Sequence, residues 1–500
     1  MATPSGTAGA LRVQTRWMRY LPAAILAALG LALAVHGSSA KTFALLVLVV
    51  VIVPLLLRPR ALLALTVLLT ILCEGPTFGL FTFTSHLYDE AFKGLTPLDA
   101  LVALTVVAVG IDIVRHRRAI VLPPVLAFPA ALLALAMLAG IVTGHANGAS
   151  TRSVILGEDT LAYLLFLPLA IVNLPLSRRQ IEVALWVALA VAMVKAVLGL
   201  VEIAGGYGEI IEGTSQLTYY EPAPNWLIMM SLLALVAAGL RRARPARWML
   251  LGSPLLLACF VLSYRRSFWI AAALGLALLV LLGLSPMGRR LLVPAALLLA
   301  LAVWALSVLG FQLADSPIVE RATSLAPSKV ESNLQDSYRL YERANVLGEI
   351  KQHPITGLGM EIPWEATVRP LPIYNPGGQL YVHFAALWWW LKLGILGLAA
   401  YVATIASALV VAWRAWRRSR EPTLKAFGLA SLCAFVGLLA IETTASFTGV
   451  DARFSVLVGV QIGVLATLGR VGVEFQPRSR KSQSRRPGGS LKQSSPSGLA

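Results

Sequence analysis

The chain has 500 residues, of which 57% are hydrophobic, with a mean hydropathy of +0.76 and a formal net charge of +18. Only 13% of the residues are charged, so the positive charge lies in short loops between apolar runs. No compact basic domain is left to hold nucleic acid. The sequence therefore indicates an integral membrane protein and excludes cytoplasmic nucleic-acid binding. Its three cysteines, Cys73, Cys259 and Cys433, lie far apart and predict neither a disulfide nor a metal site.

Apolar runs of about the length that crosses a bilayer, about 20 residues, recur along the chain. They predict an all-α polytopic membrane protein with about 12 to 14 transmembrane helices. No small-residue cleavage site follows the first run, so we expect it to remain as a span. The predicted spans are 21–36, 42–57, 61–76, 97–114, 122–143, 159–176, 181–203, 225–240, 248–264, 267–284, 291–311, 381–412, 426–443 and 455–469.

These spans divide the chain into four parts. Residues 1–311 hold about eleven spans, and residues 381–469 hold the last three. Between them, the polar segment 312–380 is longer than a connection requires, so we expect it to cap an active site. The basic tail 470–500 is rich in Ser, Pro and Gly and is expected to be disordered.

Basic residues gather on one side of the membrane when the N-terminus is placed in the cytoplasm, as the positive-inside rule requires. This orientation predicts that both termini are cytoplasmic and that segment 312–380 lies on the outer side of the inner (cytoplasmic) membrane. The cytoplasmic loops are then too short for a nucleotide-binding domain, which argues against ATP-driven transport and nucleotide-sugar donors. The basic clusters are Arg12 to Arg19, Arg58/Arg60, Arg115 to Arg118, Arg178/Arg179, Arg241 to Arg247, Arg289/Arg290, Arg414 to Lys425 and the tail from Arg470.

One amphipathic helix is predicted within the polar segment, beginning after Asp336 as its N-cap. The turn His353-Pro354, followed by Gly357 and Gly359, is expected to end it. Its apolar face is formed by Leu340, Val346 or Leu347, and Ile350, and its polar face by Arg339, Glu342, Arg343, Glu349 and Lys351.

Two arginines, Arg265 and Arg266, form a tight outward turn between two apolar helices, against the positive-inside rule. An anionic ligand such as a lipid diphosphate would explain them, since guanidinium groups bind phosphate through paired hydrogen bonds. The alternative is that both side chains contact lipid phosphates nonspecifically.

Other charged residues fall within spans or outer loops. Asp89 and Glu90 are an adjacent acidic pair that could assist a metal-dependent base, but the chain contains no Asp-x-Asp sequence. The intramembrane residues Lys195, Glu202, Lys392 and Glu442 are compatible with an ion or proton path and equally with structural ion pairs.

His383 stands in the first turn of its span, directly after the polar segment. A histidine at this place can take a proton from an acceptor hydroxyl. The alternative is an interfacial histidine among the aromatic residues Tyr381, Phe384 and Trp388.

These motifs, in this order, resemble the O-antigen ligase and polymerase family. The resemblance covers mainly Leu255 to Tyr401. Its motifs are Ser263-Tyr-Arg-Arg-Ser-Phe-Trp269, Arg339, His353-Pro-Ile-Thr-Gly-Leu-Gly359, and His383 followed by Gly394-Ile-Leu-Gly397. The resemblance implies transfer of a glycan from an undecaprenyl diphosphate carrier to an acceptor on the outer side of the membrane, without metal, nucleotide or other cofactor.

The same resemblance implies residue roles. His383 would be the catalytic base or the residue that orients the acceptor, and displacement would invert the sugar. Arg265, Arg266, Arg339 and Arg343 would form the diphosphate-binding set. The sequence departs from the family at Phe384, where a polar residue is usual, and at Arg343, where an aromatic residue is common.

We therefore expect a membrane glycosyltransferase whose partners are a polyprenyl-diphosphate-linked glycan, an acceptor that is a glycan, lipid or protein, and membrane lipids, but no nucleic acid. Two alternatives stay open. A polymerase that joins repeat units would differ only in its acceptor. An ion-coupled secondary transporter would use the intramembrane charges, although no internal repeat of the kind many transporters have is visible.

Overall fold

The part of the protein that the structure describes is all-helical apart from one two-stranded pair. The computed structural model describes residues 54–74, 82–91, 94–207, 209–210, 217–218, 221–240, 247–283, 334–371 and 378–474. The α-helices in that part are α3 (Pro59–Leu72), α4 (Pro97–Arg115), α5 (Pro124–Ala146), α6 (Thr151–Val172), α7 (Arg178–Ala204), α8 (Pro222–Leu240), α9 (Arg247–Leu251), α10 (Ser253–Leu262), α11 (Arg266–Gly283), α15 (Leu334–Gln352), α16 (Ala385–Arg418), α17 (Pro422–Glu442) and α18 (Ala452–Glu474). The 3-10 helices are η1 (Thr82–Leu87) and η3 (Gly378–Leu380), and β1 (Glu209–Ile210) pairs antiparallel with β2 (Leu217–Thr218).

Nine of the described helices are long and apolar enough to cross a membrane. The multi-pass fold predicted from the sequence is therefore confirmed. Predicted spans 21–36 and 291–311, and most of 42–57, lie outside the described residues, as do segments 312–333 and 475–500. Two predicted spans are shorter than expected: α3 ends at Leu72, and 248–264 is divided into α9 and α10. The division falls at Gly252, ahead of Pro254 in the first turn of α10, where proline starts a new helix.

Helix beginnings follow local sequence signals. Thr96 caps α4 in a reciprocal capping box with Asp99, and Ser177 caps α7 in the same way with Gln180. Ser150 caps α6 by accepting a hydrogen bond from the backbone of Ser153. These caps satisfy backbone N–H groups that would otherwise lie unpaired at the membrane boundary.

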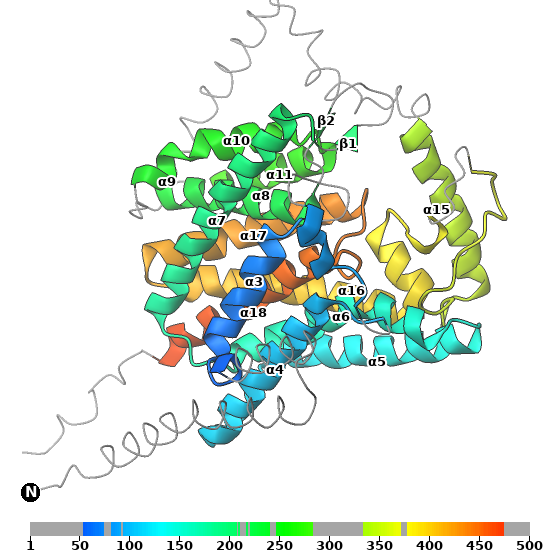
Figure 1. The fold of residues 1–500 in the computed structure, drawn as a ribbon, viewed down its shortest axis with the longest axis horizontal. Helices are drawn as coiled ribbons and strands as arrows, with labels where there is room; N and C mark the ends of the chain where they lie inside the picture. The colour runs from blue at the N-terminus through cyan, green and yellow to red at the C-terminus, as the bar shows by residue number, and fades with distance from the viewer. Residues whose placement is uncertain are drawn as a thin grey trace, which may run out of the picture.

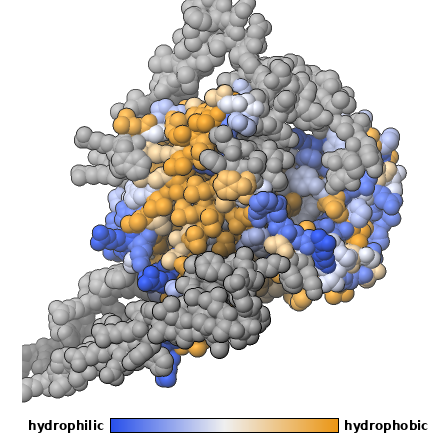
Figure 2. All heavy atoms as spheres, in the orientation of Figure 1, coloured by the Kyte–Doolittle hydropathy of each residue, from blue (hydrophilic) through white to orange (hydrophobic). Residues whose placement is uncertain are grey.

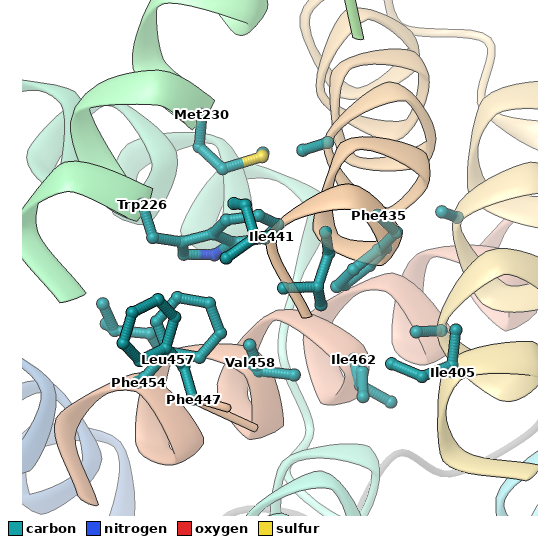
Figure 3. Close-up of a cluster of buried hydrophobic side chains, with 14 of the residues drawn as sticks. Trp226, Met230, Ile405, Phe435, Ile441, Phe447, Phe454, Leu457, Val458 and Ile462 are labelled. Atoms are coloured by element: carbon teal, nitrogen blue, oxygen red, sulfur yellow. The ribbon is translucent and has the colours of Figure 1, made fainter. Parts of the chain in front are cut away.

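The core lies where α8, α17 and α18 meet (Figure 3). The ring of Trp226 lies 5.4 Å from that of Phe454 and 6.0 Å from that of Phe435, and the indole N–H donates to Gln461. Around this contact, α6 packs on α18, α5 on α16 and α11 on α17. Small residues permit the close approach: a Cβ at Gly437 would lie 2.6 Å from the Ala271 carbonyl oxygen of α11.

A break at Gly394, whose φ is +65°, divides α16 into two halves. The loop after α15 inserts there: Leu358 N–H donates to the Leu391 carbonyl (2.7 Å), and Ile395 N–H donates to the Ile355 carbonyl (3.1 Å). A Cβ at Gly394 would overlap the Ile355 carbonyl. Two motifs that are separate in the sequence thus form one interlocked unit, in which buried backbone groups freed by the break are paired again.

The half of α16 after the break, residues 395–418, is about 36 Å long at 1.5 Å per residue. It exceeds the hydrocarbon core of about 30 Å, so it can cross the membrane alone. The single span predicted for 381–412 is therefore found as α16, one candidate span, in which residues 385–393 add length beyond one crossing at the end of the bundle where α15 lies.

Helix α15 lies at one end of the bundle and runs across the direction of α5 (Figure 1). In the same view, apolar side chains cover the centre of the visible face, and polar side chains gather on the side of α15 (Figure 2). The helix ends at Gln352 as predicted but begins at Leu334, so Asp336 lies inside it and is not its N-cap.

The predicted faces of α15 are partly wrong. Val346 and Ile350 are buried as expected, but Leu340 is 45% exposed, and the supposedly exposed Glu342 and Glu349 are buried. The reason is that α15 packs against polar backbone as well as apolar side chains. Asn345, for example, accepts hydrogen bonds from the N–H groups of Val368 and Arg369.

Candidate active site

His383 and Glu342 form a buried pair between α15 and the start of α16. The carboxylate of Glu342 is completely buried and accepts from His383 twice, at the backbone N–H (2.9 Å) and at Nδ1 (3.0 Å). A carboxylate can only accept, so Nδ1 carries a proton. The neutral ring then presents Nε2 as its proton acceptor. The imidazole is 26% exposed, so it is held firmly yet reachable.

Aromatic rings surround this pair. The imidazole meets the ring of Tyr381 edge-on at 4.9 Å and that of Tyr338 at 6.0 Å. Burial, and then the charge of Glu342, raise the pKa of Tyr338 to about 12. This phenol therefore stays neutral and adds no charge to the site.

A second loop, residues 443–451, fixes the segment that carries His383. The hydroxyl of Ser446 donates to the Val382 carbonyl (2.5 Å), and its N–H donates to the Tyr381 hydroxyl (2.9 Å). Glu442, at the end of α17, accepts from the N–H and hydroxyl of Thr448 and so holds the same loop. The position of the imidazole is thus set by two helices and one loop.

Arg265 contacts the other side of that loop. The residue is buried, and its guanidinium lies 5.3 Å from the centre of the Phe447 ring and 6.0 Å from that of Phe268. It stands in the predicted tight turn, where Tyr264 adopts a positive φ of 49°. Half-buried Arg266 is the first residue of α11, and the positive end of a helix dipole favours anions.

The two arginines of α15 have different surroundings. Arg339 is half-buried and precedes Glu342 by three residues, so both project from one face of the helix. Arg343 is exposed, and its guanidinium lies 5.5 Å from the centre of the Phe384 ring. The two residues that depart from the family pattern therefore contact each other.

The other predicted charges have separate partners. Lys195 bonds to Glu74 at 3.1 Å and lies 3.5 Å from Glu221, which in turn pairs with Arg453. Lys392 donates to the Ile362 carbonyl and fixes the loop between α15 and α16.

Asp89 and Glu90, the acidic pair that could assist a metal-dependent base, also have hydrogen-bond partners. Glu90 bonds to Arg152, which holds the pKa of this carboxyl below its usual range, and Asp89 bonds to His86. No group of three or more His, Cys, Asp or Glu side chains suited to a metal ion occurs within the described ranges. His353 is exposed beyond the end of α15, as expected for a helix stop.

Glu342 is the candidate site residue that sequence reasoning missed, since it was assigned to the polar face of α15. A signal for it exists. Tyr338, Glu342, Asn345, Val346 and Glu349 recur at helical spacing and are all buried, so polar residues interrupt a buried stripe. A carboxylate in such a stripe requires a buried donor, and histidine is the commonest ionisable one near neutral pH.

The fold and the site define a multi-pass membrane protein with a histidine-carboxylate pair at one end of its helix bundle. Residues 251–402 match the family model described as O-antigen ligase, which covers every predicted site residue. The chain therefore contains an O-antigen ligase family domain, and at family level its function is of the ligase or polymerase type, with lipid-linked glycans as substrates. No curated protein matches the chain.

Proposed function

We propose that this protein transfers a glycan from a polyprenyl diphosphate carrier to an acceptor hydroxyl, on the outer side of the inner membrane. The observation that carries the proposal is the Glu342–His383 pair, in which the carboxylate is buried and the imidazole is partly exposed. General bases of this type need a fixed tautomer and an accessible nitrogen. The pair meets both requirements.

His383 takes the proton of the acceptor hydroxyl at Nε2 while Glu342 keeps Nδ1 protonated. The acceptor oxygen forms a bond to the anomeric carbon on the face opposite the diphosphate. The bond from that carbon to the diphosphate oxygen breaks, and its electron pair leaves with the diphosphate. The sugar is inverted, and the released carrier is polyprenyl diphosphate.

Arg265, Arg266 and Arg339 bind the diphosphate in this proposal. Negative charge develops on the leaving group in the transition state, and fixed guanidinium groups in a partly dehydrated site stabilise it. The guanidinium of Arg265 lies over the ring of Phe447, and the adjacent residue Ser446 bonds to the Val382 carbonyl next to His383. The loop 443–451 therefore supports both the base and the diphosphate site. Exposed Arg343 stands at the rim and would contact the glycan or outer phosphate.

The direct test uses the full-length protein in proteoliposomes containing a polyprenyl-diphosphate-linked glycan. We expect release of polyprenyl diphosphate that depends on an added acceptor. Movement of the intact donor across the bilayer without release would support the transporter instead and refute this proposal. The acceptor separates the two activities. A polymerase transfers the glycan to a second lipid-linked repeat unit, whereas a ligase transfers it to a different acceptor.

The orientation is tested separately. Helix ends that the sequence assigns to the outer side lie together in the fold, as in the bond from Asn147 to the Leu358 carbonyl. We expect a cysteine at Gln352 to react with an impermeant reagent from outside intact cells and one at Arg117, between α4 and α5, to be protected. The reverse pattern would place the site in the cytoplasm.

A further inference from the structure

A cavity separate from the His383 site lies among α4, α5 and α6. It encloses about 490 Å³, a volume typical of sites for small ligands or lipid head groups. Its lining residues from α4 and the turn before it are Leu95, Asp99, Val102, Ala103, Val106 and Val107. From α5 and α6 it is lined mainly by Met137, Ile141, Ile155, Glu158, Asp159 and Phe166.

Glu158 is the unusual member of this lining. Its side chain is 95% buried, since only 5% of the residue is exposed, and neither carboxylate oxygen has a hydrogen-bond partner among the described residues. One oxygen of its neighbour Asp159 is in the same condition. Buried carboxylates without partners are strongly unfavourable at membrane depth, and they commonly mark a binding site.

The other charged groups near the cavity do not compensate this pair. Asp99 accepts from the Tyr163 hydroxyl and caps α4, so its hydrogen bonds are already formed. Glu361 approaches from the loop beside Gly157 and adds negative charge, which Lys392 of α16 offsets in part. His145, at the end of α5, is the one basic side chain in the lining. The cavity therefore favours a cation that can donate several hydrogen bonds.

The rim of the cavity faces the lipid. Leu95, Val107, Ile155 and Phe166 line it and are between 38% and 51% exposed. An apolar chain can lie along them in the bilayer while a polar group reaches inward. Thr151, the first residue of α6, also lines the cavity, and the N–H groups of Thr151 and Arg152, which the Ser150 cap does not use, favour a phosphate.

We propose that this cavity binds an aminophospholipid, with its primary ammonium group donating to Glu158 and Asp159 and its acyl chains along the exposed apolar rim. An ammonium carries three donors and one positive charge, which matches two adjacent carboxylates. The phosphate of the same lipid would lie near the start of α6. This lipid site is distinct from the glycan-transfer site and does not depend on the proposed transfer.

Native mass spectrometry of the delipidated full-length protein, with defined lipids added back, tests this site. We expect phosphatidylethanolamine to be retained at least tenfold more than phosphatidylglycerol or a neutral glucosyl diacylglycerol. Glu158→Gln and Asp159→Asn should each reduce that preference at least fivefold. Asp89→Asn, a change at an outer carboxylate that does not line the cavity, is the matched control and should keep it.

Equal retention of the three lipids, or an unchanged preference in both variants, would overturn the proposal. Preferential retention of the glucosyl lipid would also overturn it, and would assign the carboxylates to sugar hydroxyls. Thermal unfolding gives a check on folding: phosphatidylethanolamine should raise the melting temperature of wild type but not of Glu158→Gln. A raised temperature in both proteins contradicts binding at Glu158.

Discussion

Among the buried charged groups in the described residues, the clusters around Lys195 and His383 differ in one respect that we expect to separate chemistry from support. Around Lys195, the charged groups of Glu74, Glu221 and Arg453 are all at least nine-tenths buried and bond to one another. Around His383, the carboxylate of Glu342 is equally buried, but the imidazole is 26% exposed. The first cluster is closed, whereas the second ends in a group that a substrate can reach.

The difference teaches how to rank charged residues in a membrane protein. Position within a span, which first drew attention to Lys195 and Glu202, does not discriminate function from support. We expect that exposure of one partner in an otherwise buried pair does discriminate function from support. The variants below test that rule, in order of their expected effect on glycan transfer.

The largest effect is expected for His383→Ala. Loss of a general base typically slows a reaction by roughly 10²- to 10⁴-fold. Binding of the lipid-linked donor should persist, because the arginines that we propose to bind it are intact. Single-turnover transfer in proteoliposomes and a donor-binding assay measure the two quantities. His353→Ala, at an exposed histidine nearby, should behave as wild type, and an active His383→Ala enzyme would remove the base from the mechanism.

Next come Arg266→Lys and Arg339→Lys, for which we expect a loss of about 10²-fold in transfer, as when one fixed transition-state donor is removed. A lysine keeps the charge but cannot form the paired contact of a guanidinium with phosphate. The control is Arg369→Lys, an exposed arginine of the same segment whose guanidinium lies over Tyr341. Full activity of both site variants would contradict the diphosphate assignment.

For Glu342→Gln we expect a smaller loss, about tenfold in kcat, with little change in KM for the donor. Mispositioning of a catalytic group acts mainly on the transition state. The amide can still accept from the backbone of His383 but no longer selects the tautomer unambiguously. Glu342→Asp, a shorter carboxylate, should recover part of the rate. Exposed Glu365→Gln is the matched control. A change in KM alone would instead indicate a purely structural role.

How far the sequence predicted the structure can be seen in individual residues. The length of the apolar runs located the helices, because membrane spans need long uninterrupted runs. The O-antigen ligase domain was recognised from Arg339, His383 and the glycine motifs. The break at Gly394 was not predicted, since it depends on pairing with Ile355 and Leu358 about 40 residues earlier.

The role of Glu342 was missed for the same reason. A helix that packs on loops instead of a bilayer or an apolar core need not bury its apolar face alone, and α15 packs on the backbone of residues 368–369 and 383. Long-range partners of this kind are invisible to periodicity. The assignment of Arg265, Arg266, Arg339 and Arg343 to a diphosphate stays a prediction.

Arg343→Ala should reduce transfer by no more than about fivefold, since an exposed cation over an aromatic ring contributes only about 0.5–1 kcal/mol. Its guanidinium contacts Phe384 at the rim, away from the buried supports of His383. Phe384→Leu, which removes the ring but keeps an apolar side chain, should give a similar loss, and the double variant should be no worse than either single one. Additive losses would show that Arg343 contributes to transfer independently of its contact with Phe384.

Lys195→Met should have the smallest effect on transfer and a large effect on stability. Removal of one partner leaves Glu74 and Glu221 without their shared cation, and breaking a buried pair typically costs about 3–5 kcal/mol. We expect a lower melting temperature in detergent, while the folded fraction transfers glycan at the wild-type rate. Arg179→Met, at an exposed position on the same helix, should change neither quantity. If Lys195→Met instead kept its stability and lost transfer, the closed cluster would belong to the reaction, and exposure would fail as the criterion that separates the two regions.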